Sequence, residues 1–208
     1  MAIRLTLSKT EKPLFCESKW WGDPDMPADM EYPMMKVDGE DDYPLTFVCQ
    51  IRCEDIAGLD RENLLPHDGM LYFFAAMDEY AGYDSPVHLG IGEWPKGSVI
   101  VKYTKSINME TFQSCIMVDD DEQPVTDPAL EISFSGCGDF DDGIKLLGRP
   151  FFEEIREQYP DRVSLLQIDG DEVADIRFYD EGMLNLLVTE TDIRKGILKR
   201  PTAYMHSL

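Results

Sequence analysis

Residues 47–51 read FVCQI and residues 68–74 read DGMLYFF, and these two stretches decide the fold class. Alternating positions from residue 44 to 53 suit a half-buried β-strand, with Leu45, Phe47, Cys49, Ile51 and Cys53 expected on one face. The second stretch opens on an acidic residue and a glycine, which favour a turn, and continues as an apolar run suited to a buried strand. We therefore predict two strands with a tight turn before the second.

The same order of features occurs again later in the chain. Residues 164–168 read SLLQI and residues 181–187 read EGMLNLL, so Gln-Ile is again followed by an acidic residue, Gly, Met and Leu. We interpret this as an internal duplication of two similar β-rich halves, roughly residues 1–118 and 119–208, packed as a single domain. The alternative is a coincidence between two hairpins, because acidic-Gly turns are common.

The remaining stretches favour many strands and few helices. A long proline-rich stretch, residues 20–44, predicts an ordered loop or extended arm, because proline fixes φ and lacks an N–H donor. Helices are expected only at 151–159 and 191–195, with a helical turn near 54–59. Further strands are expected at 98–103, 113–118, 130–134, 175–178 and 202–206, besides one near the N-terminus. The fold class is therefore α+β, with largely antiparallel mixed sheets.

The chain is strongly acidic, and its charge restricts the choice of partner. Its 208 residues include 19 Lys and Arg against 41 Asp and Glu, a net charge of −22. Such a surface repels phosphate, so nucleic acid and anionic membranes are poor direct partners. Four acidic runs, 38–42, 119–122, 139–142 and 169–172, are expected to face solvent and to attract a basic protein through salt-sensitive association.

The cysteine usage and the N-terminus are typical of a cytoplasmic protein. The N-terminal sequence lacks the apolar core and cleavage site of a signal peptide, and no stretch approaches a membrane helix. The five cysteines argue against a secreted disulfide scaffold. We predict that Cys49 and Cys53 are buried, reduced and metal-free, because a structural zinc site needs four ligands.

No motif of a known chemistry is found. The chain has no G-x-S-x-G nucleophile elbow and no glycine-rich phosphate loop, so we assign no catalytic residue, no metal and no cofactor. Candidate ligand-binding or partner-binding residues are of three kinds: adjacent tryptophans, matched glutamines, and carboxylates after a predicted core strand. They are Trp20, Trp21, Gln50, Gln167, Asp169, Asp171, Glu172 and Asp180.

These candidates allow two interpretations each. The tryptophans are either recognition side chains, with one of them accessible, or staples that hold the proline-rich arm on the core. The two glutamines either hydrogen-bond backbone groups of a crossing loop or line a cleft between the halves, beside Asp169, Asp171 and Asp180. The carboxylates of residues 169–172 are either a solvated cluster or a site for a cation or a basic partner.

Six stretches, in order, resemble the YwqG-like family, also called DUF1963. They are SKWWGDPDMP (18–27), YP with PLTFVCQI (32–33 and 44–51), LPHDGMLYFF (65–74), LLGRP (146–150), LLQIDGDE (165–172) and YDEGML (179–184). Trp21 and Tyr179 stand where the family pattern has glycine. The resemblance implies mixed strands with few helices. It implies no reaction, and the link of some relatives to toxin–immunity gene neighbourhoods implies an immunity-like role.

We therefore expect a non-enzymatic protein-binding module, an immunity-like or regulatory partner of a basic protein. The alternative is an enzyme or small-ligand binder that uses a cleft lined by carboxylates and amides between the two halves. A purely structural regulator without a specific ligand is a third possibility. The sequence predicts neither the identity of the partner nor the oligomeric state.

Overall fold

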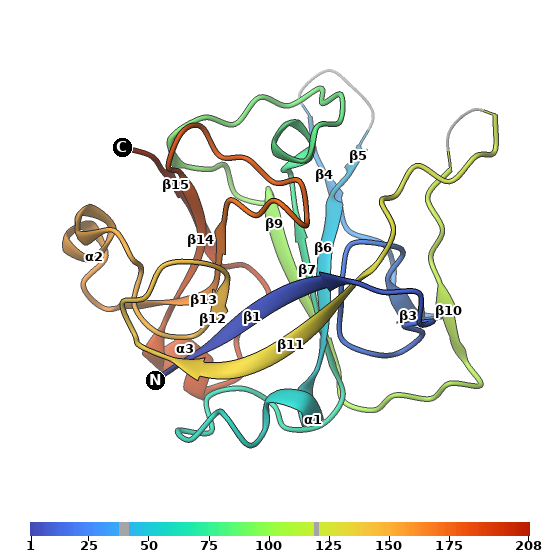
Figure 1. Ribbon diagram of the computed structural model, residues 1–208, viewed down its shortest axis with the longest axis horizontal. Helices are drawn as coiled ribbons and strands as arrows, with labels where there is room; N and C mark the ends of the chain where they lie inside the picture. Colours follow the sequence, from blue (N-terminus) through green and yellow to red (C-terminus); the bar gives the residue numbers. More distant parts are fainter. Residues whose placement is uncertain (38–41, 119–120) are drawn as a thin grey trace.

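The computed structural model describes residues 1–37, 42–118 and 121–208 (Figure 1). Parts of two predicted acidic runs, residues 38–41 and 119–120, lie outside the described residues. The strands are β1 (Ala2–Lys9), β2 (Lys19–Trp20), β3 (Asp25–Pro27), β4 (Met34–Met35), β5 (Tyr43–Pro44), β6 (Thr46–Arg52), β7 (Met70–Ala75), β8 (Gly92–Glu93), β9 (Val99–Thr104), β10 (Phe112–Ser114), β11 (Leu130–Cys137), β12 (Lys145–Leu146), β13 (Arg162–Asp169), β14 (Met183–Thr189) and β15 (Thr202–His206). The helices are α1 (Cys53–Ile56), α2 (Glu153–Gln158) and α3 (Glu190–Arg194), with a 3-10 turn at Asp78–Ala81.

In the described parts of the chain, one sheet contains eleven strands in the order β8-β15-β14-β13-β12-β1-β11-β2-β6-β7-β9. Every pair of neighbouring strands in it is antiparallel. Two small sheets, β3 with β10 and β4 with β5, lie beside it. The predicted mixture of antiparallel sheet and few helices is confirmed. None of the described helices is long and apolar enough to span a membrane.

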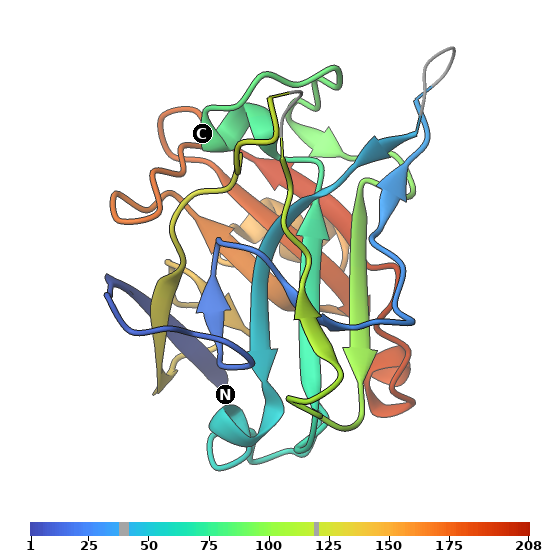
Figure 2. The same cartoon turned by 90° about the vertical axis from the view of Figure 1, so that its right-hand side faces the viewer.

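The large sheet curls strongly, and its two ends approach each other (Figures 1 and 2). Its end strands β8 and β9 are joined by residues 94–98 alone, and the Val101 N–H donates to the Lys199 carbonyl at 3.1 Å. A sheet curled in this way encloses one face, and that face holds the main apolar core, which includes Ile3, Val48 and Leu165. Burial of this continuous apolar surface is the dominant stabilising term.

The strands on the two sides of the central pair β1 and β11 are paired in matching ways. Lys19 of β2 lies opposite Gln50 of β6, and Lys145 of β12 lies opposite Gln167 of β13. Both β6 and β13 are interrupted by a bulge, at residue 48 between Phe47 and Cys49 and at residue 165 between Ser164 and Leu166. β1, the first strand of residues 1–118, pairs with β12 of the later residues. β11, the first strand of residues 119–208, pairs in turn with β2 of the earlier residues.

The bulge in β6 overturns the expectation that Leu45, Phe47, Cys49, Ile51 and Cys53 share one face. A bulge adds one residue to a strand, and side chains beyond it therefore point to the opposite face. Leu45 and Phe47 pack in an outer cluster with Met70 and Tyr72, whereas Cys49, Ile51 and Cys53 lie in the enclosed core. A strict alternation read from the sequence cannot reveal an extra residue of this kind.

The proline-rich stretch 20–44 is more regular than expected. It begins in β2, inside the large sheet, and contributes β3 and β4 to the small sheets that cover the outer cluster. On the other flank, α2 covers a second outer cluster with Phe152, Ile155 and Met183. The helices predicted at 151–159 and 191–195 are confirmed within a few residues, and Thr189 caps α3 by accepting from the Asp192 N–H. The strand predicted at 175–178 is wrong, because that stretch makes only an isolated bridge at Ile176.

Candidate functional site

The two adjacent tryptophans are both buried. Trp20 is 0% exposed and Trp21 is 4% exposed, and their rings meet edge to face with centroids 5.7 Å apart. The Trp21 Nε1–H donates to the Ala174 carbonyl at 2.9 Å, which fastens the arm to the distant C-terminal half. Neither indole presents a free face to solvent. One edge of Trp21, however, contributes to the wall of the pocket described below.

Gln50 holds the segments on either side of β2 together. Its Oε1 accepts from the Asp25 N–H at 2.9 Å, and its Nε2 donates to the Glu17 carbonyl at 2.8 Å. The side chain is 0% exposed. A buried amide must satisfy both its donor and its acceptor groups, and Gln50 does so mainly with backbone.

Gln167 makes the corresponding contacts around β12. Its Oε1 accepts from the Phe151 N–H at 2.9 Å, and its Nε2 donates to the Gly143 carbonyl at 2.9 Å. It too is 0% exposed. Four strands, β12, β1, β11 and β2, separate its strand from that of Gln50. The two amides therefore bond to backbone of neighbouring segments, and neither is open to a ligand.

We predict that Gln50→Leu and Gln167→Leu each lower the free energy of unfolding by about 1–3 kcal/mol, because each leaves buried backbone groups without partners. Chemical denaturation of the two variants measures this directly. Gln113→Leu is the matched control, since Gln113 is exposed on β10 and its replacement should change stability little. Unchanged stability in either buried variant would contradict the bonding role.

The predicted carboxylates do not converge on one site. Asp169 accepts from the Gly143 and Gly170 N–H groups at 2.9 and 2.8 Å, and burial raises its pKa. Asp171 accepts from two N–H groups of its own turn, residues 173 and 174. Glu172 and Asp180 are exposed. The first two carboxylates therefore stabilise local turns, while the last two remain free on the surface.

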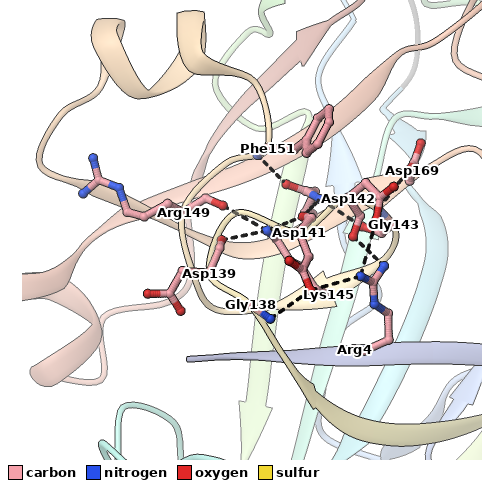
Figure 3. Close-up of polar contacts among 11 residues, drawn as sticks. Arg4, Gly138, Asp139, Asp141, Asp142, Gly143, Lys145, Arg149, Phe151 and Asp169 are labelled. Atoms are coloured by element: carbon pink, nitrogen blue, oxygen red, sulfur yellow. Dashed lines mark hydrogen bonds and ion pairs between the residues drawn. The ribbon is translucent and has the colours of Figure 1, made fainter.

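Lys145 is the centre of the polar network beside Gln167 (Figure 3). Its side chain is 0% exposed, and its ammonium donates to the carbonyls of Asp139 at 2.8 Å, Arg149 at 3.0 Å and Asp141. Burial lowers the pKa of Lys145 to about 8. All three donors of the ammonium are satisfied, so this lysine fixes the two loops on either side of β12.

The outer side of the same network carries charged groups at the surface. Arg4 donates to the Asp142 carbonyl and lies 3.7 Å from the Asp141 carboxylate and 3.5 Å from that of Asp142 (Figure 3). Half-exposed ion pairs of this kind contribute little to stability. The acidic run 139–142, expected to be a solvated face, is therefore in part a folded loop organised by Lys145 and Arg4.

A second buried lysine, Lys19, has a carboxylate partner. Its Nζ lies 2.7 Å from the Asp25 Oδ2, and the two side chains are 7% and 0% exposed. The Asp25 carboxylate also accepts from the Cys16 N–H at 2.8 Å, the Gln50 amide at 2.9 Å and the Ser114 hydroxyl at 2.6 Å. Through these bonds, Asp25 connects the arm to β6 and to β10.

The two cysteines of β6 and α1 are buried and unpaired. Cys49 and Cys53 are each 0% exposed, and burial raises the pKa of both thiols, that of Cys53 to about 12. The folded protein therefore keeps the Cys53 thiol protonated in a pH range in which the unfolded chain loses that proton. The absence of metal at this pair stays a prediction.

This difference predicts a loss of stability at alkaline pH. Between about pH 9 and the folded pKa, the native state binds more protons than the unfolded state, so the free energy of unfolding falls as pH rises. Between about pH 8 and about pH 10.5, Cys53 should lower the free energy of unfolding by about 2 kcal/mol in total. The slope is about 1.4 kcal/mol per pH unit once the thiol of the unfolded chain has lost its proton. Urea denaturation of the wild type and Cys53→Ala at both pH values measures it. An equal loss in both proteins would refute the assignment.

A hollow lined by acidic and aromatic residues lies elsewhere, between the arm and the residues Met117 and 125–127. We call it the acidic pocket. Its volume is about 240 Å³. Its lining residues are Trp21, Gly22, Tyr32, Tyr43, Pro44, Leu45, Thr46, Phe47, Asp78, Tyr83, Asp84, Met117, Val125, Thr126 and Asp127. This described lining contains three carboxylates and no Lys, Arg or His.

Asp78 is the buried carboxylate of the acidic pocket. It begins the 3-10 turn after β7, and 7% of its surface is exposed. Its Oδ1 accepts from the Thr46 hydroxyl, while its Oδ2 is buried without a hydrogen-bond partner among the described residues. Burial raises the pKa of Asp78, an effect that the nearby Thr46 and Tyr43 hydroxyls partly offset. Burial of a carboxylate is costly, and the Thr46 and Tyr43 hydroxyls reduce that cost for Asp78.

The remaining polar groups lie nearer the solvent. The Tyr83 hydroxyl donates to the exposed Asp127 carboxylate at 2.6 Å, and Asp84 is also exposed. Burial raises the pKa of Tyr43 to about 12 and raises that of Tyr83 further, so both stay neutral hydroxyls at physiological pH. The pocket thus combines an acidic rim, aromatic walls and a buried carboxylate.

Sequence reasoning missed Asp78, Tyr83, Asp84 and Asp127 as site residues. It did single out the arm as a segment of interest, and residues of the arm contribute to the lining. The pocket forms because the arm, the turn after β7 and the stretch before β11 lie side by side in the fold. These segments are far apart in the sequence, so no local sequence pattern predicts their contact. Trp21 is the sole residue of the predicted set that lines it.

The comparison with known families agrees with the resemblance described above. The family described as "Domain of unknown function (DUF1963)" matches residues 18–139, more than half of the chain, so the chain belongs to this family. None of the curated proteins compared with the chain matches it. The matched segment contains every residue that lines the acidic pocket, whereas Lys145 and Gln167 lie beyond it.

Two departures from the family pattern coincide with unusual backbone. Trp21 and Tyr179, at which the resemblance in sequence led us to expect glycine, have φ angles of 56° and 53°. Glycine adopts positive φ without strain, whereas other residues incur a cost. Both residues therefore hold a backbone conformation that glycine adopts more readily.

Proposed function

We propose that this protein is a non-enzymatic binding module that docks a basic protein over the acidic pocket. The observation that carries the proposal is the lining of that pocket, in which Asp78, Asp84 and Asp127 converge with no cationic side chain beside them. Carboxylates brought together in this way repel one another unless a cation is present. A partner with positive charge relieves that repulsion.

The overall charge supports the same partner class. A net charge of −22 creates a long-range field that accelerates encounter with a basic protein and slows encounter with an acidic one. Aromatic side chains at an interface supply contact area, and the walls of the pocket provide Tyr43 and Tyr83 for this purpose. The electrostatic field of the protein accounts for the attraction of a basic partner, and the acidic pocket accounts for where that partner docks.

We also propose that the two sequence halves are copies of one β-rich unit. The support is the matched pairing of Lys19 with Gln50 and of Lys145 with Gln167, together with a bulge at the same place in β6 and β13. The units differ in what their buried lysine meets, a carboxylate in one half and backbone carbonyls in the other. They differ also in the acidic pocket, because only the first half has an arm that contributes to its lining.

A peptide titration tests the proposed function. We expect a fluorescent lysine-rich peptide to bind the wild type, and a glutamate-rich peptide of the same length to bind negligibly. The double variant Asp84→Asn/Asp127→Asn should weaken binding of the lysine-rich peptide by roughly 3–10-fold, as expected for loss of partly exposed charge contacts.

The control for net charge is Glu172→Gln/Asp180→Asn, which removes the same number of charges from exposed positions outside the pocket lining. It should weaken binding much less. If both double variants weaken the peptide equally, the attraction is a general property of the surface and the docking site is wrong. If the wild type binds neither peptide, the proposed function itself fails.

A further inference from the structure

A groove runs along the outer edge of the large sheet, where β9 is the last strand. The Val101 N–H donates to the Lys199 carbonyl at 3.1 Å, which holds residues 199–200 beside β9, and arm residues 29–31 line the groove as well. Its volume of about 550 Å³ lies within the ~300–1,000 Å³ of pockets that take small organic molecules. None of its described lining residues lines the acidic pocket, so the two hollows are separate.

Three positively charged side chains line this groove, in a chain with only 19 Lys and Arg against 41 Asp and Glu. They are Lys102, Lys199 and Arg200. Asp29 and Glu31 line the groove too, yet within the described part of the chain none of the three cations lies within 4.0 Å of a carboxylate oxygen. Cations that stay unpaired in so acidic a protein are available to an anion from outside. We call this hollow the cationic groove.

Lys102 is the best fixed of the three cations. It projects from β9, is half-buried, and its ammonium donates to the Glu31 carbonyl of the arm. Burial lowers the pKa of Lys102, the Glu31 carboxylate raises it, and the nearby Lys199 ammonium lowers it. The two ammonium groups are therefore close enough to repel each other, and an anion bound between them relieves that repulsion.

We propose that the cationic groove binds a small organic phosphate, with the phosphate group on Lys102, Lys199 and Arg200. A phosphate monoester has a charge of about −1.5 to −2 at pH 7 and three acceptor oxygens, so it neutralises a group of cations better than a single carboxylate does. The Arg200 guanidinium suits two phosphate oxygens at once, while the lysines act as point charges.

The carboxylates of the same groove determine what else the ligand carries. Asp29 and Glu31 are exposed and offer acceptors to hydroxyl groups, whereas they repel a ligand with further negative charge. The net charge of −22 opposes polyanions over long distances, but a ligand with one phosphate responds mainly to charges within roughly 8–10 Å. The chemistry therefore favours a hydroxylated molecule with one phosphate, such as a sugar phosphate, over nucleic acid.

Calorimetric titration of the full chain tests this inference with three probes: glucose 6-phosphate, inorganic phosphate and glucose. We expect glucose 6-phosphate to bind several-fold more tightly than inorganic phosphate, and glucose not to bind measurably. Lys199→Gln/Arg200→Gln should weaken binding of glucose 6-phosphate at least tenfold. The matched control Lys9→Gln/Lys96→Gln removes the same charge from exposed positions outside the groove and should change the affinity less than twofold.

A second variant keeps all three cations in place. Thr104→Glu adds a carboxylate to the lining and should abolish binding of glucose 6-phosphate. Absence of glucose 6-phosphate binding to the wild type, equal weakening in the control, or binding that survives both groove variants would overturn the inference. A phosphoserine peptide that binds this groove more tightly than glucose 6-phosphate would also overturn it, in favour of a phosphorylated protein.

The outcome is independent of the proposed function. The lysine-rich peptide should bind Lys199→Gln/Arg200→Gln at least as tightly as the wild type, because the groove and the acidic pocket share no described lining residue. If the peptide binds and glucose 6-phosphate does not, this inference alone is wrong. If glucose 6-phosphate binds and the peptide does not, the proposed function alone is wrong.

Discussion

Replacing Asp25 with alanine is expected to lower the free energy of unfolding by about 3–5 kcal/mol, the largest effect of any single substitution considered for this fold. The carboxylate is 0% exposed and lies 2.7 Å from the ammonium of Lys19, which is itself buried. Without Asp25, that ammonium is left inside the protein with no counter-charge. Three further donors, on Cys16, Gln50 and Ser114, lose their acceptor at the same time.

A double-mutant cycle separates the pair from the rest of the network. Lys19→Met combined with Asp25→Leu should be less destabilising than the sum of the single changes, because neither charge is then stranded. The exposed pair Lys12 and Glu131, 3.0 Å apart, is the matched control, and Lys12→Met should cost at most about 1 kcal/mol. Additive effects at Lys19 and Asp25 would show that the ion pair does not hold the arm.

Lys145→Met should give the second large effect, a loss on the order of 3 kcal/mol of unfolding free energy. The ammonium bonds to three backbone carbonyls of the two loops that flank β12, and methionine fills the volume but donates nothing. Because burial already disfavours the charged lysine, the net loss is smaller than three separate hydrogen bonds would suggest.

Hydrogen exchange locates the effect of Lys145→Met. We expect faster exchange of amides in residues 138–151 and little change in β6 and β7, on the other side of the sheet. Lys9→Met is the control, since Lys9 is exposed at the end of β1. A variant as stable as the wild type, with exchange in this loop unaltered, would show that Lys145 does not organise it.

The strands that carry most of the core could be predicted from the sequence, because alternation and apolar runs report burial directly. The pairs formed by β6 with β7 and by β13 with β14 follow the two matched sequence patterns. The two-residue strands β2 and β12 could not be predicted. Each contains a lysine in the interior of a sheet, and burial of a lysine depends on partners supplied by distant segments.

The site was less predictable than the fold. Gln50 and Gln167 are matched and buried, as the sequence analysis allowed, but they bond to backbone and leave no cleft between them. The acidic pocket depends on the turn at Asp78 meeting the stretch that ends at Asp127. Asp84 and Asp127 alone resemble ordinary surface charge, and only their presence in one lining with Asp78 and several aromatic side chains indicates a binding site.

The salt dependence of association is the most direct test of docking at the acidic pocket. The association rate of the lysine-rich peptide is measured by stopped-flow fluorescence from about 50 mM to about 300 mM salt, for the wild type and Asp84→Asn/Asp127→Asn. We predict a steep fall of the wild-type rate, by roughly tenfold or more, and a slower, flatter rate for the variant. A wild-type rate that does not change with salt, or a variant with the same salt dependence, would contradict electrostatic capture of a basic partner at this pocket.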